Sequence, residues 1–170
     1  MIHNEIEMEK ERLKFCIGRY DHYYDSVNNK SNVLLALGVF VTGGLVALYP
    51  FLADKVNCTL CVYLMLGAEI CLGLAAVLVT KTATTPYLRS GTDSLHYFGS
   101  VAQLSTQQFG TLSEQMTEAQ EITDLRCQVS ALAKGLAIKF TRLRVASILI
   151  IIQFALFIPL LILLLINLKK

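Results

Sequence analysis

Residues 145–166 read VASILIIIQFALFIPLLILLLI, which is a run of 22 residues without one charged side chain. An α-helix rises about 1.5 Å per residue, so a run of this length crosses the roughly 30 Å hydrocarbon layer of a bilayer. Two further runs have the same character: VLLALGVFVTGGLVALYPFL at 33–52, and LCVYLMLGAEICLGLAAVLV at 60–79, in which Glu69 carries the single charge. The three runs predict an all-α integral membrane protein with three transmembrane helices.

The composition agrees with this prediction and excludes other classes of protein. Of the 170 residues, 54% are hydrophobic and only 16% are charged, which is unlike a soluble globular domain. The net charge of +2 provides no strong basic surface, so nucleic acid is not an expected partner. Because 32 mostly polar residues precede the first run, we interpret that run as a retained span and not as a cleaved signal peptide.

The basic residues predict the orientation in the membrane. Residues 1–32 and 80–144 together carry twelve Lys or Arg, whereas the loop between the first two runs and the C-terminal tail together carry three. The positive-inside rule therefore places the N-terminus in the cytoplasm and the C-terminus outside. Lys169 and Lys170 favour an alternative in which the last run is a re-entrant hairpin around Pro159.

Both cytoplasmic segments show helical periodicity. Apolar and aromatic residues recur at steps of three, four or seven from Ile6 to Leu34, and at three and four from Ile122 to Leu136. Neither apolar face can bury itself alone, so we expect the two to pair with each other or across subunits in a cytoplasmic helical bundle. We therefore predict a single unit that covers residues 1–170. A cytoplasmic helix (1–32) precedes the spans at 33–52 and 60–79. Residues 80–144 then form a loop (80–94) and cytoplasmic helices, and the last span follows at 145–166.

Capping patterns predict where the helices after the loop begin. Ser105 and Gln108 are spaced as a capping box for a short helix that ends near Met116. Thr117 and Gln120 repeat the pattern, so a long helix is expected to begin there and to continue toward the third run.

Two pairs of residues in or beside the spans are candidate sites. Glu69 lies at the midpoint of its run, where an ionised side chain costs on the order of 2.5–3.5 kcal/mol, and Gln153 lies at a similar depth. Two interpretations stay open: a neutral Glu69 hydrogen-bonded to Gln153, or a carboxylate that faces a pore in an oligomer.

Cys58 and Cys61 form one C-x-x-C motif. A zinc site needs four ligands, so without further ligands the motif predicts no metal site, and packing residues or a disulfide remain as interpretations.

Polar, basic and aromatic side chains gather just before the first span. Such a belt commonly anchors a helix at the membrane interface. The alternative is a site for a small anionic ligand, with its phosphate on Lys30 or Arg19 and its base stacked on a tyrosine. The candidate ligand-binding residues are Arg19, Tyr20, Tyr24, Asn29, Lys30 and Asn32.

A second polar group comprises Arg89, Asp93, His96 and Tyr97. No catalytic residue is predicted, because the chain lacks a nucleophile elbow, a phosphate-binding glycine loop and a carboxylate pair.

Several short stretches accompany this order of spans. They are Asn29-Lys30-Ser31-Asn32 running into Val33-Leu34-Leu35, then Pro86, Leu95-His96-Tyr97-Phe98-Gly99, Phe109, Asp124-Leu125-Arg126-Cys127-Gln128, and Lys139-Phe140. With them, the chain resembles the transmembrane effector family of Pycsar anti-phage systems over most of its length. Several members of that family carry Ala-Asp-x-Lys-Ala before the first span, and this chain shares only Lys30 with that pattern.

The resemblance implies a non-enzymatic effector in the bacterial inner membrane. A functionally linked nucleotide cyclase would make a cyclic pyrimidine mononucleotide (cCMP or cUMP) during infection, and the effector, a homo-oligomer in the lipid bilayer, would then impair the membrane. The alternative function is a constitutive membrane scaffold whose cytoplasmic helices dock a partner protein.

Overall fold

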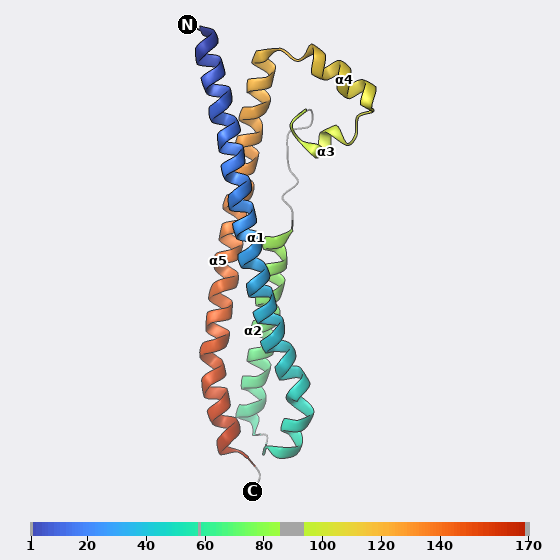
Figure 1. The fold of residues 1–170 in the computed structure, drawn as a ribbon. Coiled ribbons are helices and arrows are strands. Elements are labelled where there is room, and N and C mark those ends of the chain that lie inside the picture. Colours follow the sequence, from blue (N-terminus) through green and yellow to red (C-terminus); the bar gives the residue numbers. More distant parts are fainter. Residues whose placement is uncertain (1, 58, 86–93, 169–170) are drawn as a thin grey trace. The chain divides into compact units, whose positions relative to one another are not determined.

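A computed structural model describes residues 2–57, 59–85 and 94–168. Within these ranges the fold is all-α (Figure 1). The helices are α1 (Ile2–Lys55), α2 (Leu60–Thr84), α3 (Phe98–Val101), α4 (Thr106–Gln115) and α5 (Glu118–Ile166). The chain forms two compact units, unit 1 (Met1–Ser26 and Pro86–Ile138) and unit 2 (Val27–Thr85 and Lys139–Lys170). Helices α1 and α5 each contribute to both units.

Three helices are long and apolar enough to cross a membrane, as judged by length and composition. They contain the three predicted runs and cover Glu5–Pro50, Leu60–Thr84 and Glu118–Ile166. Within their most apolar stretches only 17%, 28% and 22% of the residues are buried inside the chain. Most of this apolar surface therefore faces outward, which is the arrangement that a multi-pass membrane protein requires.

The third run is a single helix. Helix α5 continues through Pro159 to Ile166, so the alternative of a hairpin around this proline is wrong. After α5, the N–H of Asn57 donates to the carbonyl oxygen of Asn167 over 2.8 Å, and Val56 pairs with Leu168 in an antiparallel bridge. The end of α5 therefore lies beside the connection between α1 and α2.

Helix α2 is longer than the sequence predicted. The loop expected at 80–94 is wrong for its first five residues, which are helical. The threonines there were interpreted as loop residues, but their hydroxyls donate to carbonyl oxygens three or four residues earlier: Thr80 to Ala76 over 2.7 Å, and Thr82 to Val79 over 2.7 Å. A hydroxyl that is satisfied in this way is compatible with a helix.

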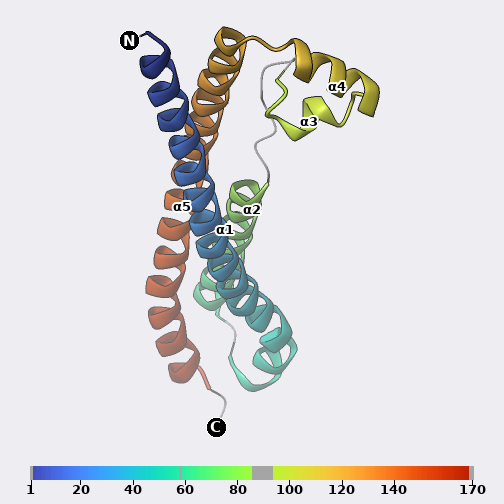
Figure 2. The same cartoon turned by 45° about the horizontal axis from the view of Figure 1, so that its top comes forward.

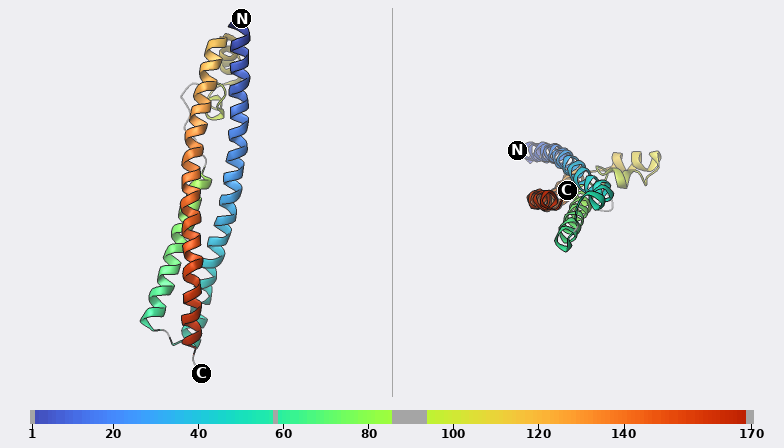
Figure 3. Two further views of the ribbon diagram at one scale, coloured as in Figure 1. Left: turned by 90° about the vertical axis from the view of Figure 1, so that its left-hand side faces the viewer. Right: turned by 90° about the horizontal axis from the view of Figure 1, so that it is seen from below.

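Unit 2 packs α1, α2 and α5 lengthwise beside one another (Figure 3). The buried residues of α2 recur at steps of four and three, namely Val62, Leu66, Glu69, Gly73, Ala76, Thr80 and Ala83. This spacing is typical of helices packed along a shared seam. Near the connection between α1 and α2, the seam is filled by an apolar plug of four residues, Leu45, Val62, Leu66 and Leu160.

Unit 1 has a small core of its own between α1 and α5. Leu13 of α1 packs with Ile122 and Leu125 of α5, and Ile6 and Ile17 lie against them. The expected pairing of the two apolar faces is therefore made within one chain. Both predicted helix starts are confirmed by their hydrogen bonds, since the capping residues before α4 and α5 bond the glutamine three positions later. The short α3, which precedes α4 in the chain (Figure 2), was not predicted.

Candidate functional site

The six candidate ligand-binding residues all lie on α1 but belong to different units. In unit 1, the guanidinium of Arg19 donates to the hydroxyl of Tyr23 over 2.7 Å and lies over the rings of Phe15 and Tyr23. The hydroxyl of Tyr24 donates to the carbonyl oxygen of Leu132 over 3.0 Å, while Tyr20 is half-buried. Two of the three residues in unit 1 are thus engaged in contacts that stabilise the unit.

The other three candidates lie in unit 2 and point into solvent. Asn29, Lys30 and Asn32 are exposed and sit immediately before the first apolar run. Their neighbour Ser31 is fully buried, and its hydroxyl has no hydrogen-bond partner. The exposed ammonium of Lys30 is able to bind an anionic group without first breaking an internal contact.

Lys139 joins all three helices of unit 2, and its partner Asn28 directly precedes Asn29 in the chain. Its side chain is 3% exposed, and its ammonium donates to the carbonyl oxygen of Ala83 over 2.7 Å and to Oδ1 of Asn28 over 3.1 Å. A third contact reaches the carbonyl oxygen of Thr84 over 3.5 Å. Burial lowers the pKa of the Lys139 amine, and the nearby positive charge of Arg142 lowers it further. A cation at this position caps the C-terminal carbonyls of α2 and complements the helix dipole.

A polar site lies within the seam of unit 2. It comprises Thr42 of α1, Glu69 and Gly73 of α2, and Gln153 of α5. Nε2 of Gln153 donates to Oγ1 of Thr42 over 3.2 Å. Glu69 is fully buried, yet both of its carboxyl oxygens and Oε1 of Gln153 have no hydrogen-bond partner. The hydrogen bond between Glu69 and Gln153, which the first of the two interpretations requires, is therefore not made, and Gln153 donates to Thr42.

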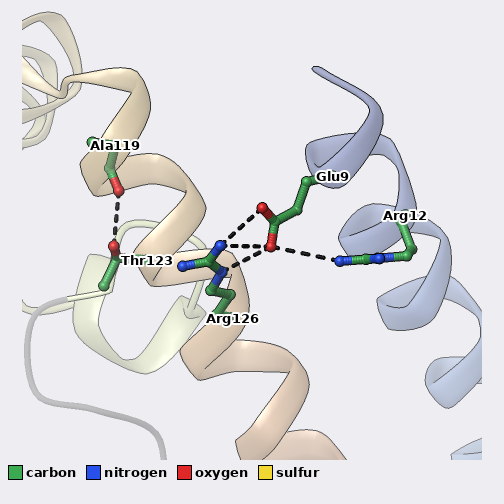
Figure 4. Close-up of polar contacts among 5 residues, drawn as sticks. All are labelled: Glu9, Arg12, Ala119, Thr123 and Arg126. Carbon is green, nitrogen blue, oxygen red and sulfur yellow. Dashed lines mark hydrogen bonds and ion pairs between the residues drawn. The ribbon is translucent and has the colours of Figure 1, made fainter. Parts of the chain in front are cut away.

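Arg126 of α5 binds Glu9 of α1 through two hydrogen bonds in unit 1 (Figure 4). Its Nε donates to Oε1 over 2.9 Å, and its Nη2 donates to Oε2 over 2.8 Å. Arg12 lies 3.6 Å from the same carboxylate. One turn before Arg126, the hydroxyl of Thr123 donates to the carbonyl oxygen of Ala119 over 2.8 Å, which satisfies it within the helix. The paired geometry is the strong form of an arginine–carboxylate contact.

A second ion pair joins the same two helices. Nζ of Lys10 lies 2.6 Å from Oε2 of Glu121. The hydrogen bond between them raises the pKa of Lys10 and lowers the pKa of Glu121. Together with the contact of Glu9, this pair fixes α1 against α5 in unit 1.

The remaining candidates give no metal site in the described ranges. Cys61 is exposed with a free thiol, whereas Cys58, Arg89 and Asp93 lie outside the described residues. Across 2–57, 59–85 and 94–168, no group of three or more His, Cys, Asp or Glu side chains is placed to hold a metal ion.

Comparison with protein families decides the identity of the chain. The family model described as the Pycsar effector protein domain, PycTM, matches residues 12–167, which include the three apolar runs at 33–52, 60–79 and 145–166. The chain belongs to this Pycsar effector family. No curated protein and no solved structure matches it. Family membership implies an anti-phage membrane effector in a system that signals through cyclic pyrimidine nucleotides.

Two stretches that carried the resemblance to Pycsar effectors contact each other in unit 1. Oδ2 of Asp124 accepts a hydrogen bond from the N–H of Leu95 over 3.0 Å, and Nε2 of Gln128 donates to Oγ of Ser94 over 2.8 Å. Between them, Leu125 is 1% exposed in the core of the unit. These residues of the effector therefore hold the segment before α3 against α5.

Sequence reasoning missed two residues that this Pycsar effector places at polar contacts. Thr42 was read only as part of an apolar run, although it is a polar residue on the same face as Leu45. Lys139 was assigned no role, although its spacing of four and seven residues from Leu143 and Ala146 places it on the buried face of α5. In both cases a polar residue at a core position was the available signal.

Proposed function

We propose that this Pycsar effector is a non-catalytic membrane protein that impairs the bacterial inner membrane when a cyclic pyrimidine mononucleotide, cCMP or cUMP, binds to it. The family match supports the proposal, because it extends from α1 to the end of α5 and so includes every apolar helix. In this proposal the N-terminus lies in the cytoplasm, and several copies assemble in the bilayer.

In this proposal the ligand phosphate binds Lys30, while Asn29 and Asn32 are further candidate donors on other faces of α1. These side chains are exposed, whereas Arg19 and Tyr24 already contact residues of unit 1. Because α1 is one continuous helix from before Lys30 through the first apolar run, a ligand at Lys30 acts directly on a membrane-spanning helix. Arg19, Tyr20 and Tyr24 form the alternative group, with aromatic rings on which a base stacks.

A contact of this kind is strong enough to operate a switch. A charge-assisted hydrogen bond contributes about 1.5–3 kcal/mol, which changes a two-state equilibrium roughly ten- to a hundredfold when it is made in one state only. A ligand that bound both states equally would change nothing. The proposal therefore requires that the phosphate contact at Lys30 exists only in the membrane-impairing state.

The test is the membrane potential of cells that express the effector with an active cyclase or with its inactive mutant, read with a voltage-sensitive dye. Depolarisation is expected only with the active cyclase. Lys30→Ala raises the nucleotide concentration needed by roughly ten- to a hundredfold, whereas Lys14→Ala, which removes another exposed lysine of α1, leaves it unchanged.

Two results would contradict the proposal. Equal depolarisation with the active and the inactive cyclase shows a constitutive pore. No depolarisation with either, at matched expression of the effector, favours the constitutive scaffold that docks a partner protein.

A further inference from the structure

The polar site of unit 2 has unsatisfied groups of one kind. Two carboxyl oxygens of Glu69 and the amide oxygen of Gln153 are buried without a hydrogen-bond partner. With Glu69 ionised, all three accept hydrogen bonds and none donates. Leaving such groups unpaired in an apolar interior costs about 1–3 kcal/mol each, and more for a charged one. The site is therefore suited to a species that supplies positive charge.

Neighbouring contacts place these groups together. A side chain added at Gly73 would collide with Oγ1 of Thr42 and would come within 2.6 Å of Nε2 of Gln153, so α2 passes directly against both residues. Glu69 lies one helical turn before Gly73 on the same buried face of α2. Three helices thus contribute polar atoms to one level of the seam.

The seam differs on the two sides of Glu69. Toward the connection between α1 and α2 it is closed by the apolar plug of Leu45, Val62, Leu66 and Leu160. Toward the other end of α2 the buried residues are small or polar, namely Gly73, Ala76, Thr80 and Ala83. On that side Leu143 and Ile150 of α5 are also buried, so the helices pack closely in this conformation.

Two prolines lie close in the chain to residues of the plug. Pro159 directly precedes Leu160 in α5, and Pro50 follows Leu45 by five residues in α1. A proline inside a helix removes one backbone hydrogen bond and lowers the cost of bending there. Helices α1 and α5 therefore bend most easily beside the residues that close the seam.

We propose that small monovalent cations cross the membrane through this seam within a single subunit, with Glu69 as the cation-binding residue and the apolar plug as the closed gate. The inference rests on the proposed membrane-impairing function and names what passes and where. A carboxylate selects cations over anions, and the predicted spans 33–52, 60–79 and 145–166 contain no Lys or Arg. The buried ammonium of Lys139 caps the seam at Ala83 and Thr84, so this contact must also open before a cation reaches Glu69 from that end.

The first experiment opens the plug without nucleotide. The full chain is placed in vesicles of phosphatidylethanolamine and phosphatidylglycerol with a KCl gradient, high inside, and the potential is read with a dye. Leu66→Ala, at a side chain that is 4% exposed, is expected to give an inside-negative potential because K⁺ leaves faster than Cl⁻. The wild type is expected to develop no potential. Leu64→Ala is the matched control, because this leucine lies on the same helix and is 66% exposed, and it is also expected to develop no potential. Replacing K⁺ by choline under a pH gradient separates a proton path from a path for K⁺.

The second experiment leaves the plug intact. Glu69→Gln in the nucleotide-activated protein is expected to reduce the ratio of K⁺ to Cl⁻ permeability roughly tenfold, because one buried charge is removed. This arm decides the inference even if Leu66→Ala fails to fold.

The two proposals fail in different ways. If nucleotide opens the wild type but Glu69→Gln leaves the permeability ratio unchanged, or if a dye-sized solute such as calcein escapes, the path lies elsewhere and only this inference is overturned. If nucleotide opens nothing in the wild type, the proposed function fails, while a cation-selective leak in Leu66→Ala still supports the seam as the path.

Discussion

Gly73→Ala tests the close packing of the polar site. An alanine is favoured over glycine within a helix by about 1 kcal/mol, so an unobstructed site would become more stable. At Gly73 the added Cβ collides with Oγ1 of Thr42 and crowds Nε2 of Gln153. Overpacking costs about 1–3 kcal/mol, and the loss of the hydrogen bond between Thr42 and Gln153 costs a further 0.5–1.5 kcal/mol or so. The expected net result is a destabilisation of about 1–3 kcal/mol.

Gly67→Ala is the matched control, because it lies on the same helix and an added Cβ there meets nothing within 4 Å. The free energy of unfolding is measured for both variants by denaturant titration in one detergent. Gly67→Ala is expected to equal or exceed the wild type, and Gly73→Ala to fall below it. If the two variants are equally stable, the packing of α2 against Thr42 and Gln153 described above is refuted.

Three further predictions concern the ends of the helices. Lys139→Met keeps the apolar part of the side chain but removes the donor to Ala83 and Asn28. The free energy of unfolding is expected to fall by about 1.5–3 kcal/mol. Unchanged stability would show that the Lys139 ammonium does not stabilise the fold. The hydrogen bond from Lys10 lowers the pKa of Glu121. The ion pair therefore stabilises the fold at a pH above the usual titration range of a glutamate carboxyl, and this stabilisation is lost as the pH falls through the lowered pKa. In Glu121→Gln, the free energy of unfolding is expected to depend less steeply on pH on the acid side. Two reporters are fused after Lys170, one that is active only outside the cytoplasm and one that is active only inside it. The first is expected to be active. Activity of the second would overturn the predicted orientation.

The sequence is enough to predict the helices wherever composition or capping decides the structure. The run at 145–166 has no stable alternative to a helix in an apolar environment, and the capping boxes at Ser105 and Thr117 act through neighbours three residues away. Residues 80–84 were misread because threonine is common in loops, and only the carbonyl groups of the preceding turn show that its hydroxyl is satisfied within a helix.

The candidate site was less predictable, because it depends on how helices line up. The sequence predicts Glu69 and Gln153 as polar residues of the spans, but which partner Gln153 bonds depends on how α5 lines up with α1 and α2, and here the partner is Thr42. Lys139 is a comparable case. Its partners lie 56 and 111 positions away in the chain, and no local pattern specifies contacts at such separations.

In the proposed function, this chain alone binds the nucleotide and impairs the membrane. The most direct measurement is the potential across vesicles that contain only the purified, full-length effector, followed as cCMP or cUMP is added, with cAMP as the matched control. We expect a cyclic pyrimidine nucleotide to dissipate the potential, whereas cAMP leaves it unchanged. An unchanged potential with cCMP and cUMP at saturating concentration, from protein that is correctly inserted, would contradict it.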